Sequence, residues 1–275
     1  MLGVLKGLIP ERLKLAIRAR RSISGGEVEM PLLPLMCDPA QTSVDVGANV
    51  GVFTWLMCKA SRAVVAIEPH PDLARKLEAG CGRKVRVLGC ALSDHAGLAT
   101  LSIPLLDGAD LASRATLEGT VNTEFARRTV TVPLRTLDSL QLGPVGFIKV
   151  HVEGHEYPAL LGAKATIAAS HPTIFVGSEE RHVAGGRERI QAYLSGLGYA
   201  GYFFDHGQLK SIDEFDADIH QRPERAKRPG QAYTPDYISN FLFVHPSRSA
   251  VLSKLRARLR PANPSAAPLA RPASA

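Results

Sequence analysis

The chain lacks any apolar run as long as the ~18 residues that a bilayer-spanning helix needs. Its apolar N-terminal stretch is interrupted by Lys6 and Pro10 and has no small-residue cleavage site, so we expect no signal peptide. Only four of the 275 residues are cysteine, and no two have C-x-x-C spacing, which argues against a zinc cage and a disulfide framework. These absences favour a reducing, cytoplasmic location.

Acidic residues are scarce at the two ends of the chain. The net charge of the chain is +7. Residues 1–25 contribute +5, and residues 246–275, which include no acidic residue, contribute +6. Residues 26–245 therefore have a net charge of −4. A mildly acidic centre is a poor platform for nucleic acid, so we expect no nucleic-acid partner. The basic ends are either solvated termini or weakly attracted to an anionic membrane surface, where "ERLKLAIRARR" (11–21) would form an amphipathic helix.

The centre of the sequence alternates between strand and helix patterns. Apolar stretches predict strands at 42–47, 63–69, 84–92, 146–152, 172–178, 199–204 and 237–244, and helical spacing predicts helices at 50–60, 71–80, 156–170 and 187–198. Such alternation predicts an α/β fold with a mostly parallel, doubly wound sheet. We expect three parts: a basic extension (1–31), the α/β domain (32–245) and a Pro/Ala-rich, disordered basic tail (246–275).

The end of the first predicted strand has the features of a nucleoside site. In "SVDVGANVGVF", Asp45 stands near the strand tip, and Gly47, Asn49 and Gly51 allow a tight turn into a helix. The turn is too short for G-x-G-x-x-G and is not a phosphate loop. The second strand ends at Glu68, where a carboxylate suits ribose hydroxyls. The alternative for Glu68 is a charge partner of the next helix N-terminus.

Five motifs in order resemble the FkbM family of S-adenosylmethionine-dependent methyltransferases. They are "VDVGANVGVFTWLMCKA", "VVAIEPHPDLARKLEA", "ALSDHAG", "VPLRTLDSL" and "FIKVHVEGHEYPALLGA", within a resemblance that runs from about residue 32 to 244. The resemblance implies the class I methyltransferase fold, a Rossmann-like sheet of seven strands whose last strand is antiparallel. It also implies the cofactor S-adenosyl-L-methionine and a hydroxyl acceptor on a sugar, glycan or secondary metabolite. The implied cofactor-binding residues are Asp45, Gly47, Ala48, Asn49, Gly51, Glu68 and Asp94, the last of which is equally explained as an ordinary turn residue.

The stretch "FIKVHVEGHE" ends the predicted strand at 146–152 with a cluster of ionisable groups. Side-chain alternation places Lys149, His151 and Glu153 on one face, while Glu156 would open the next helix. These four are the candidate catalytic residues. The family pattern K-[IV]-D-V-E-G-x-E has Asp at the position of His151, so His151 is either the general base of methyl transfer or a residue that orients the substrate.

A second departure from the family pattern is Gly177, which stands where an acid is usual, with Glu179 and Glu180 just after it. A metal bound by "HVEGHE" is disfavoured because Gly154 interrupts the strand alternation and H-E-x-x-H is absent. The rival functions are an NAD-type oxidoreductase and a cofactor-binding module with weakened activity. The insert at 105–127 is the expected acceptor-recognition lid over the strand ends.

Overall fold

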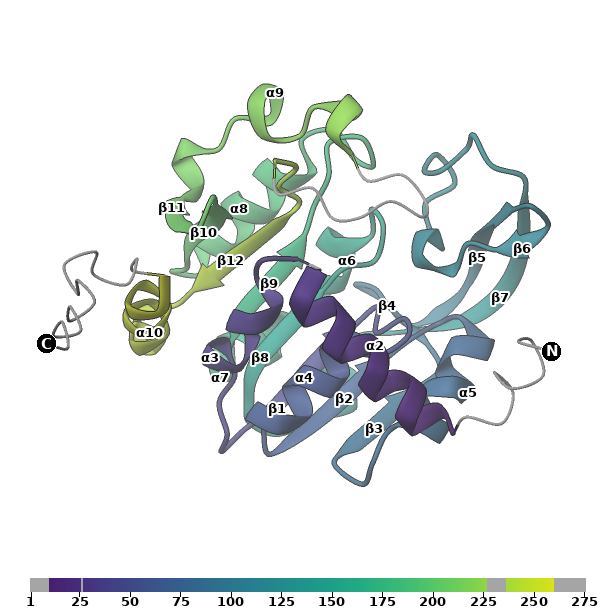
Figure 1. Ribbon diagram of the computed structural model, residues 1–275, viewed down its shortest axis with the longest axis horizontal. Coiled ribbons are helices and arrows are strands. Elements are labelled where there is room, and N and C mark those ends of the chain that lie inside the picture. The colour runs from purple at the N-terminus through teal and green to yellow at the C-terminus, as the bar shows by residue number, and fades with distance from the viewer. Residues whose placement is uncertain (1–9, 26, 227–235, 260–275) are drawn as a thin grey trace, which may run out of the picture.

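A computed structural model describes residues 10–25, 27–226 and 236–259 of the chain. Its centre is one eight-stranded sheet in the order β11-β10-β12-β9-β8-β1-β2-β3 (Figure 1). The strands are β1 (Thr42–Val46), β2 (Ala63–Ile67), β3 (Val85–Leu88), β8 (Val145–Val150), β9 (Thr173–Gly177), β10 (Ala200–Asp205), β11 (Gln208–Ser211) and β12 (Asn240–Val244).

The strand β1 marks the point where the order of the sheet reverses. It pairs in parallel with β2 on one side and with β8 on the other. In a sheet of this kind the connections leave in opposite directions at the reversal, which opens a crevice beyond the carboxyl ends of the strands. Any ligand site is therefore expected beyond Val46, Ile67 and Val150.

Helices cover both faces of the sheet because the buried strands send apolar side chains to both sides. Phe147 and Phe175 pack into one layer with α3 (Leu33–Met36), α4 (Val52–Ala60) and α10 (Ala250–Leu259). Ile148 and Val176 pack into the opposite layer with α6 (Glu156–Leu161), α7 (Lys164–Ser170) and α8 (Gly186–Gly196). The helices α2 (Glu11–Gly25) and α5 (Pro71–Gly80) flank α4 and β3 (Figure 1).

The expected α/β fold is confirmed, but the main sheet has eight strands where seven were expected. The extra strand, β11, forms an antiparallel hairpin with β10. The expected antiparallel last strand is present, because β12 runs antiparallel to both β9 and β10. A hairpin extension of this kind adds an edge strand without altering the parallel centre that carries the site.

A second, four-stranded sheet lies beside the first. Its order is β4-β7-β5-β6, with β4 (Ala91–Leu92), β5 (Gly97–Leu106), β6 (Ala109–Asp110) and β7 (Arg127–Arg135). The single strand expected at 84–92 is thus divided. Its first part, β3, belongs to the main sheet, and its second part, β4, pairs with β7.

Two further expectations need correction. The helix expected at 156–170 breaks into α6 and α7 at Gly162, whose backbone packs so closely on Ser93 that an added Cβ would lie 2.0 Å from the Ser93 carbonyl oxygen. The tail expected to be disordered from residue 246 contains α10, because Val251 and Leu255 are apolar at helical spacing and are buried in the core. Residues 260–275 lie outside the described part of the chain. In that part, no helix has the length and apolar character needed to cross a bilayer.

Candidate active site

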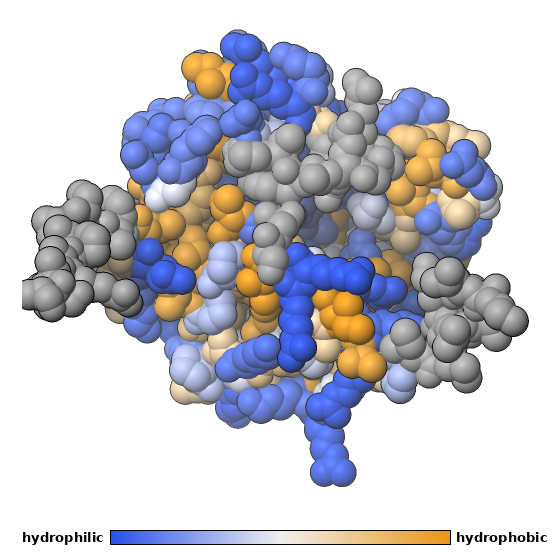
Figure 2. All heavy atoms as spheres, in the orientation of Figure 1, coloured by the Kyte–Doolittle hydropathy of each residue, from blue (hydrophilic) through white to orange (hydrophobic). Residues whose placement is uncertain are grey.

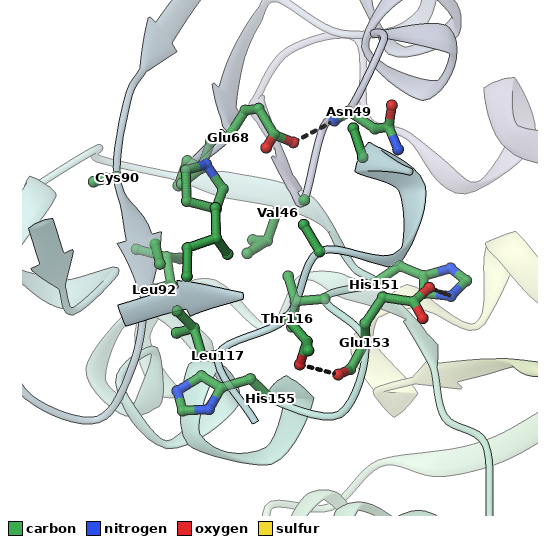
Figure 3. A pocket seen from close by; sticks show the side chains of 18 of the residues that line it. Val46, Asn49, Glu68, Cys90, Leu92, Thr116, Leu117, His151, Glu153 and His155 are labelled. Carbon is green, nitrogen blue, oxygen red and sulfur yellow. Dashed lines mark hydrogen bonds and ion pairs between the residues drawn. The ribbon is translucent and has the colours of Figure 1, made fainter. Parts of the chain in front are cut away.

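A cavity opens beyond the carboxyl ends of β1, β2 and β8, where the reversal of strand order predicts a ligand site. Figure 3 shows Glu68 and Asn49 at one side of it and His151, Glu153 and His155 at another. The wall opposite the main sheet comes from the insert between β6 and β7, through Ala112, Ser113 and the stretch 115–117. The cavity is therefore enclosed by the main sheet, the ionisable strand end and part of the expected lid.

The glycine turn after β1 is shaped by three left-handed backbone positions. Gly47, Asn49 and Gly51 have φ angles of 74°, 49° and 85°. A Cβ on Gly47 would lie 2.1 Å from the backbone oxygen of His151, so only glycine lets the turn approach the end of β8 this closely. Gly47 and Asn49 line the cavity, whereas Ala48 and Gly51 are buried beneath the turn.

Glu68 is the carboxylate that faces the cavity from the end of β2. Its side chain accepts hydrogen bonds from the backbone N–H groups of Asn49 (2.6 Å) and His70 (2.8 Å), and it is only 5% exposed. Burial raises the pKa of Glu68, and the two backbone donors oppose that rise. Each carboxylate oxygen has a second lone pair, so Glu68 can still accept hydrogen bonds from a ligand.

Asp45 and Lys149 are buried beneath the cavity and do not line it. Asp45 is fully buried, accepts a hydrogen bond from Thr54 Oγ1 (2.6 Å) and lies 3.2 Å from Lys149 Nζ. The same ammonium donates to the backbone oxygens of Val46 (3.2 Å) and Gly47 (2.8 Å). This buried ion pair holds the turn from beneath the cavity.

Asp94 and Glu156 do not line this cavity either. The Asp94 side chain is 49% exposed and contacts His95 Nδ1 at 2.6 Å. Glu156 accepts hydrogen bonds from the backbone N–H groups of Val152 (2.8 Å) and Gly154 (3.1 Å), and so fixes the loop that follows β8. Burial raises the pKa of Glu156 to about 7.

His151 and Glu153 line the cavity together at the end of β8. His151 Nε2 lies 4.0 Å from Glu153 Oε1, and the other oxygen, Oε2, lies 3.3 Å from Nε2 of His182. Glu153 has a φ angle of 55°, an uncommon conformation for a residue other than glycine. The chain thus places one carboxyl group between two imidazoles.

Burial sets the protonation of these groups. It lowers the pKa of His151 to about 4, assisted by the nearby positive charge of Lys149. It likewise lowers the pKa of His182 to about 4 and raises that of Glu153 to about 8. At neutral pH both imidazoles are therefore uncharged and can accept a proton or a hydrogen bond.

The lid segment is tied to the strand end by Thr116 and by His155, and only His155 belongs to the ionisable cluster noted in the sequence. Thr116 Oγ1 donates to the backbone oxygen of Glu153 (2.6 Å). His155 bridges the lid and the core, with Nδ1 2.6 Å from Glu118 Oε1 and Nε2 3.0 Å from Ser93 Oγ. Single polar residues in loops follow no periodicity, so a local pattern cannot predict such contacts.

The acids that follow Gly177 do not enter this cavity. Glu179 is held by Arg181 Nε (2.5 Å) and by the hydroxyl of Tyr237 (2.6 Å). Burial alone would raise the pKa of Glu179, but the Arg181 guanidinium outweighs it and lowers the value to about 2. Glu180 accepts a hydrogen bond from the backbone N–H of Gly185.

A family model described as the methyltransferase FkbM domain matches residues 45–207, which is more than half of the chain. The chain belongs to the FkbM methyltransferase family, and the enzyme class that its motifs predict, a methyltransferase, is confirmed at that level. No curated protein matches the chain.

Solved structures that resemble this chain share little sequence with it. An FkbM methyltransferase from Methylobacillus flagellatus KT is 16% identical, with a TM-score of 0.45, over 75% of this chain and 44% of that one. An O-methyltransferase from Bacillus cereus in complex with SAH is 13% identical, with a TM-score of 0.43, over 88% and 94%. An rRNA methylase from Streptococcus thermophilus is 11% identical, with a TM-score of 0.39, over 78% and 92%. The chain thus spans less than half the length of the FkbM methyltransferase.

Proposed function

We propose that the protein transfers a methyl group from S-adenosyl-L-methionine to a hydroxyl group of a sugar, glycan or secondary metabolite. The observation that carries this proposal is one cavity with a nucleoside-type wall, formed by the glycine turn and Glu68, and a proton-accepting wall, formed by His151 and Glu153. Membership of the FkbM family supports the methyl transfer. The choice of a hydroxyl group as the acceptor rests on the proton-accepting chemistry of His151 and Glu153 in the second wall.

The residues present fit the cofactor. Gly47 brings backbone close to the cavity, and Glu68 is an oriented, buried carboxylate that can accept hydrogen bonds from two ribose hydroxyls. Apolar side chains of Ile67, Leu92 and Leu101 offer an apolar surface for a purine ring. When bound, S-adenosyl-L-methionine would supply an electrophilic methyl group.

The chain would prepare the acceptor by taking its proton. A hydroxyl oxygen becomes a better nucleophile when a nearby base removes its hydrogen, and a neutral imidazole is such a base. His151 is neutral and borders the cavity, so its free ring nitrogen would accept the hydroxyl proton. Glu153 and His182 lie next in line, and the carboxyl group would pass the proton on from one imidazole to the other.

The lid segment would exclude water from this step. Thr116 and Glu118 are hydrogen-bonded to the loop after β8, so the segment is positioned over both walls of the cavity. Enclosure of this kind limits competing hydrolysis and strengthens the interaction of the acceptor hydroxyl with His151. The proposed location is the cytoplasm, because all four cysteines are free thiols.

Two measurements test the proposal. Thermal shift with S-adenosylhomocysteine and with NAD separates a methyltransferase from the oxidoreductase alternative, and we expect stabilisation by the first ligand alone. Incubation with methyl-labelled S-adenosyl-L-methionine and a panel of hydroxylated glycans and metabolites should then yield a labelled ether. Stabilisation by NAD would favour the oxidoreductase, and tight S-adenosylhomocysteine binding without transfer to any acceptor would favour the inactive binding module.

A further inference from the structure

A second cavity, remote from the candidate active site, lies between α2, the C-terminal half of α4 and the start of β3. Its floor includes Trp55, Cys58, Cys81 and Val85, which are apolar or weakly polar. Its remaining side chains are Arg12, Lys59, Arg83 and Lys84, which are exposed and basic, and no acidic residue of the described chain lines it. This basic-rimmed pocket therefore combines an apolar floor with a concentrated positive charge.

Trp55 and the helix α2 place further basic and apolar side chains together beside the pocket. Lys59 Nζ lies over the Trp55 ring at 5.5 Å, so the cation is held at the edge of the pocket. On α2, next to Arg12, the aliphatic residues Leu13 and Ile17 are 52% and 37% exposed, whereas Leu15 and Ala19 face the core. Figure 2 shows apolar surface between strongly hydrophilic side chains on the face that carries α2 (Figure 1).

The pocket faces away from the active-site cavity. Lys84 and Val85 stand at the start of β3, and Lys59 is near the end of α4, which runs antiparallel to the strands. The pocket is thus at the amino ends of the parallel strands, while the active-site cavity is at their carboxyl ends. A large surface could cover the pocket and leave the active site open.

We propose that the basic-rimmed pocket and the outer face of α2 bind the surface of a bilayer that contains anionic phospholipid. Lysine and arginine side chains attract the headgroup phosphates, and the exposed aliphatic side chains of α2 with the half-buried indole of Trp55 would enter the boundary between headgroups and acyl chains. A single-stranded nucleic acid would need several aromatic platforms for its bases, and this pocket has only Trp55. This proposal is independent of the reaction proposed above.

Trp55 makes the proposal directly measurable because it is the only tryptophan in the chain. The full chain is mixed with vesicles of phosphatidylcholine alone or with equal parts of phosphatidylglycerol, and the emission of Trp55 is recorded. We expect a blue shift, and quenching by lipids brominated on the acyl chain, only with the anionic vesicles. Both effects should weaken at about 0.5 M salt, where surface charges are screened within a few ångströms.

A matched pair of variants locates the site. Arg83→Glu with Lys84→Glu reverses two charges on the pocket, and Arg256→Glu with Arg258→Glu makes the same change on exposed positions of α10. We expect the first pair to weaken vesicle partitioning at least tenfold and the second to change it less than twofold. Equal losses in both variants, or an unchanged Trp55 spectrum with anionic vesicles, would overturn the proposal.

Two further controls make the result specific. A stronger Trp55 response to a single-stranded oligonucleotide than to anionic vesicles would also overturn the proposal. Circular dichroism and S-adenosylhomocysteine binding of the Arg83→Glu/Lys84→Glu variant should match those of the parent chain, since neither residue lies near the active-site cavity. Failure of methyl transfer in the parent chain leaves the vesicle result unaffected.

Discussion

The imidazole of His151 fills the space beside Gly177. A Cβ on Gly177 would lie 2.7 Å from two carbon atoms of the His151 ring and 2.9 Å from Nδ1. The strands β8 and β9 are paired in register up to Val150 and Val176, so these two residues are the next neighbours at the strand ends. The two departures from the family pattern, His where Asp is usual and Gly where an acid is usual, are therefore one structural unit.

Gly177→Ala is expected to destabilise the protein by about 1–3 kcal/mol, because the new methyl group overlaps the His151 ring. In a His151→Ala background, Gly177→Ala should change the free energy of unfolding little. A double-mutant cycle should therefore give a coupling free energy of about the size of the destabilisation in the parent chain. Urea unfolding of the four proteins measures it. Gly196→Ala is the control, since a Cβ there meets no atom within 4 Å. Additive effects at 151 and 177 would show that the two positions are not coupled.

Glu68→Gln is expected to weaken S-adenosylhomocysteine binding about tenfold or more. The amide has only one acceptor oxygen, so it cannot satisfy the backbone N–H groups of both Asn49 and His70 and also bind ribose hydroxyls. Isothermal titration calorimetry measures the change. Asp94→Asn is the comparison, because the exposed Asp94 lies outside the cavity and its loss should change the affinity less than twofold. The reverse ranking would mean that Asp94, and not Glu68, holds the nucleoside.

The succession of strands and helices along the chain and the position of the glycine turn could be predicted from the sequence, because both follow from local patterns. Strand alternation also places Lys149, His151 and Glu153 on one face, but β8 ends at Val150, so the strand register extends only to Lys149, opposite Phe175. Side-chain alternation also does not tell how deeply each side chain is buried. Lys149 is enclosed beneath the turn by Asp45 and by the ring of Phe53, 5.3 Å away, whereas His151 reaches the cavity.

Contacts between segments far apart in the chain could not be predicted in this way. The pairing of Glu153 with His182 joins the loops after β8 and β9, and the bridge from Glu118 through His155 to Ser93 joins three separate segments. Each depends on where the loops come together, which no periodicity of a single segment encodes. Within the insert 105–127, the expected lid, Ala112, Ser113 and the stretch 115–117 line the cavity.

The rate of methyl transfer is expected to rise with pH through about 8. Glu153 accepts a proton only as a carboxylate, and burial raises its pKa to about 8, while His151, with a pKa of about 4, is already neutral across this range. Glu153→Gln should remove the rise and lower kcat by about 10²- to 10⁴-fold. The measurement is kcat from pH 5 to 10 at saturating cofactor. The exposed Glu224→Gln is the control, and a Glu153→Gln enzyme with the parent profile would exclude this carboxyl group from proton transfer.

His182→Ala should displace the same pH profile. Neutral His182 can accept a hydrogen bond from the protonated carboxyl group of Glu153, 3.3 Å away, and so stabilises the protonated form. Removing that acceptor should lower the pKa of Glu153 and move the rise in kcat to lower pH. A residue with a purely structural role would lower kcat uniformly. A profile of unchanged midpoint would therefore show that His182 does not stabilise the protonated form of Glu153.

Glu29→Gln is expected to stabilise the protein at alkaline pH. Glu29 is 2% exposed, and burial together with nearby Glu27 raises its pKa to about 8 from the ordinary value of 4.5. Between these two values the unfolded chain releases the proton while the folded chain keeps it, so the free energy of unfolding falls as pH rises through this window. At about 1.4 kcal/mol for each pKa unit, the loss by pH 8 is on the order of 4 kcal/mol.

The neutral glutamine avoids that loss because it has no proton to release. Urea unfolding should therefore show Glu29→Gln to be about 2–5 kcal/mol more stable than the parent chain at pH 8 and within about 1 kcal/mol of it at pH 5. The exposed Glu78→Gln on α5 is the control and should differ by less than about 0.5 kcal/mol at both values. Equal stabilities of parent and Glu29→Gln at pH 8 would mean that the folded protein accommodates a charged Glu29.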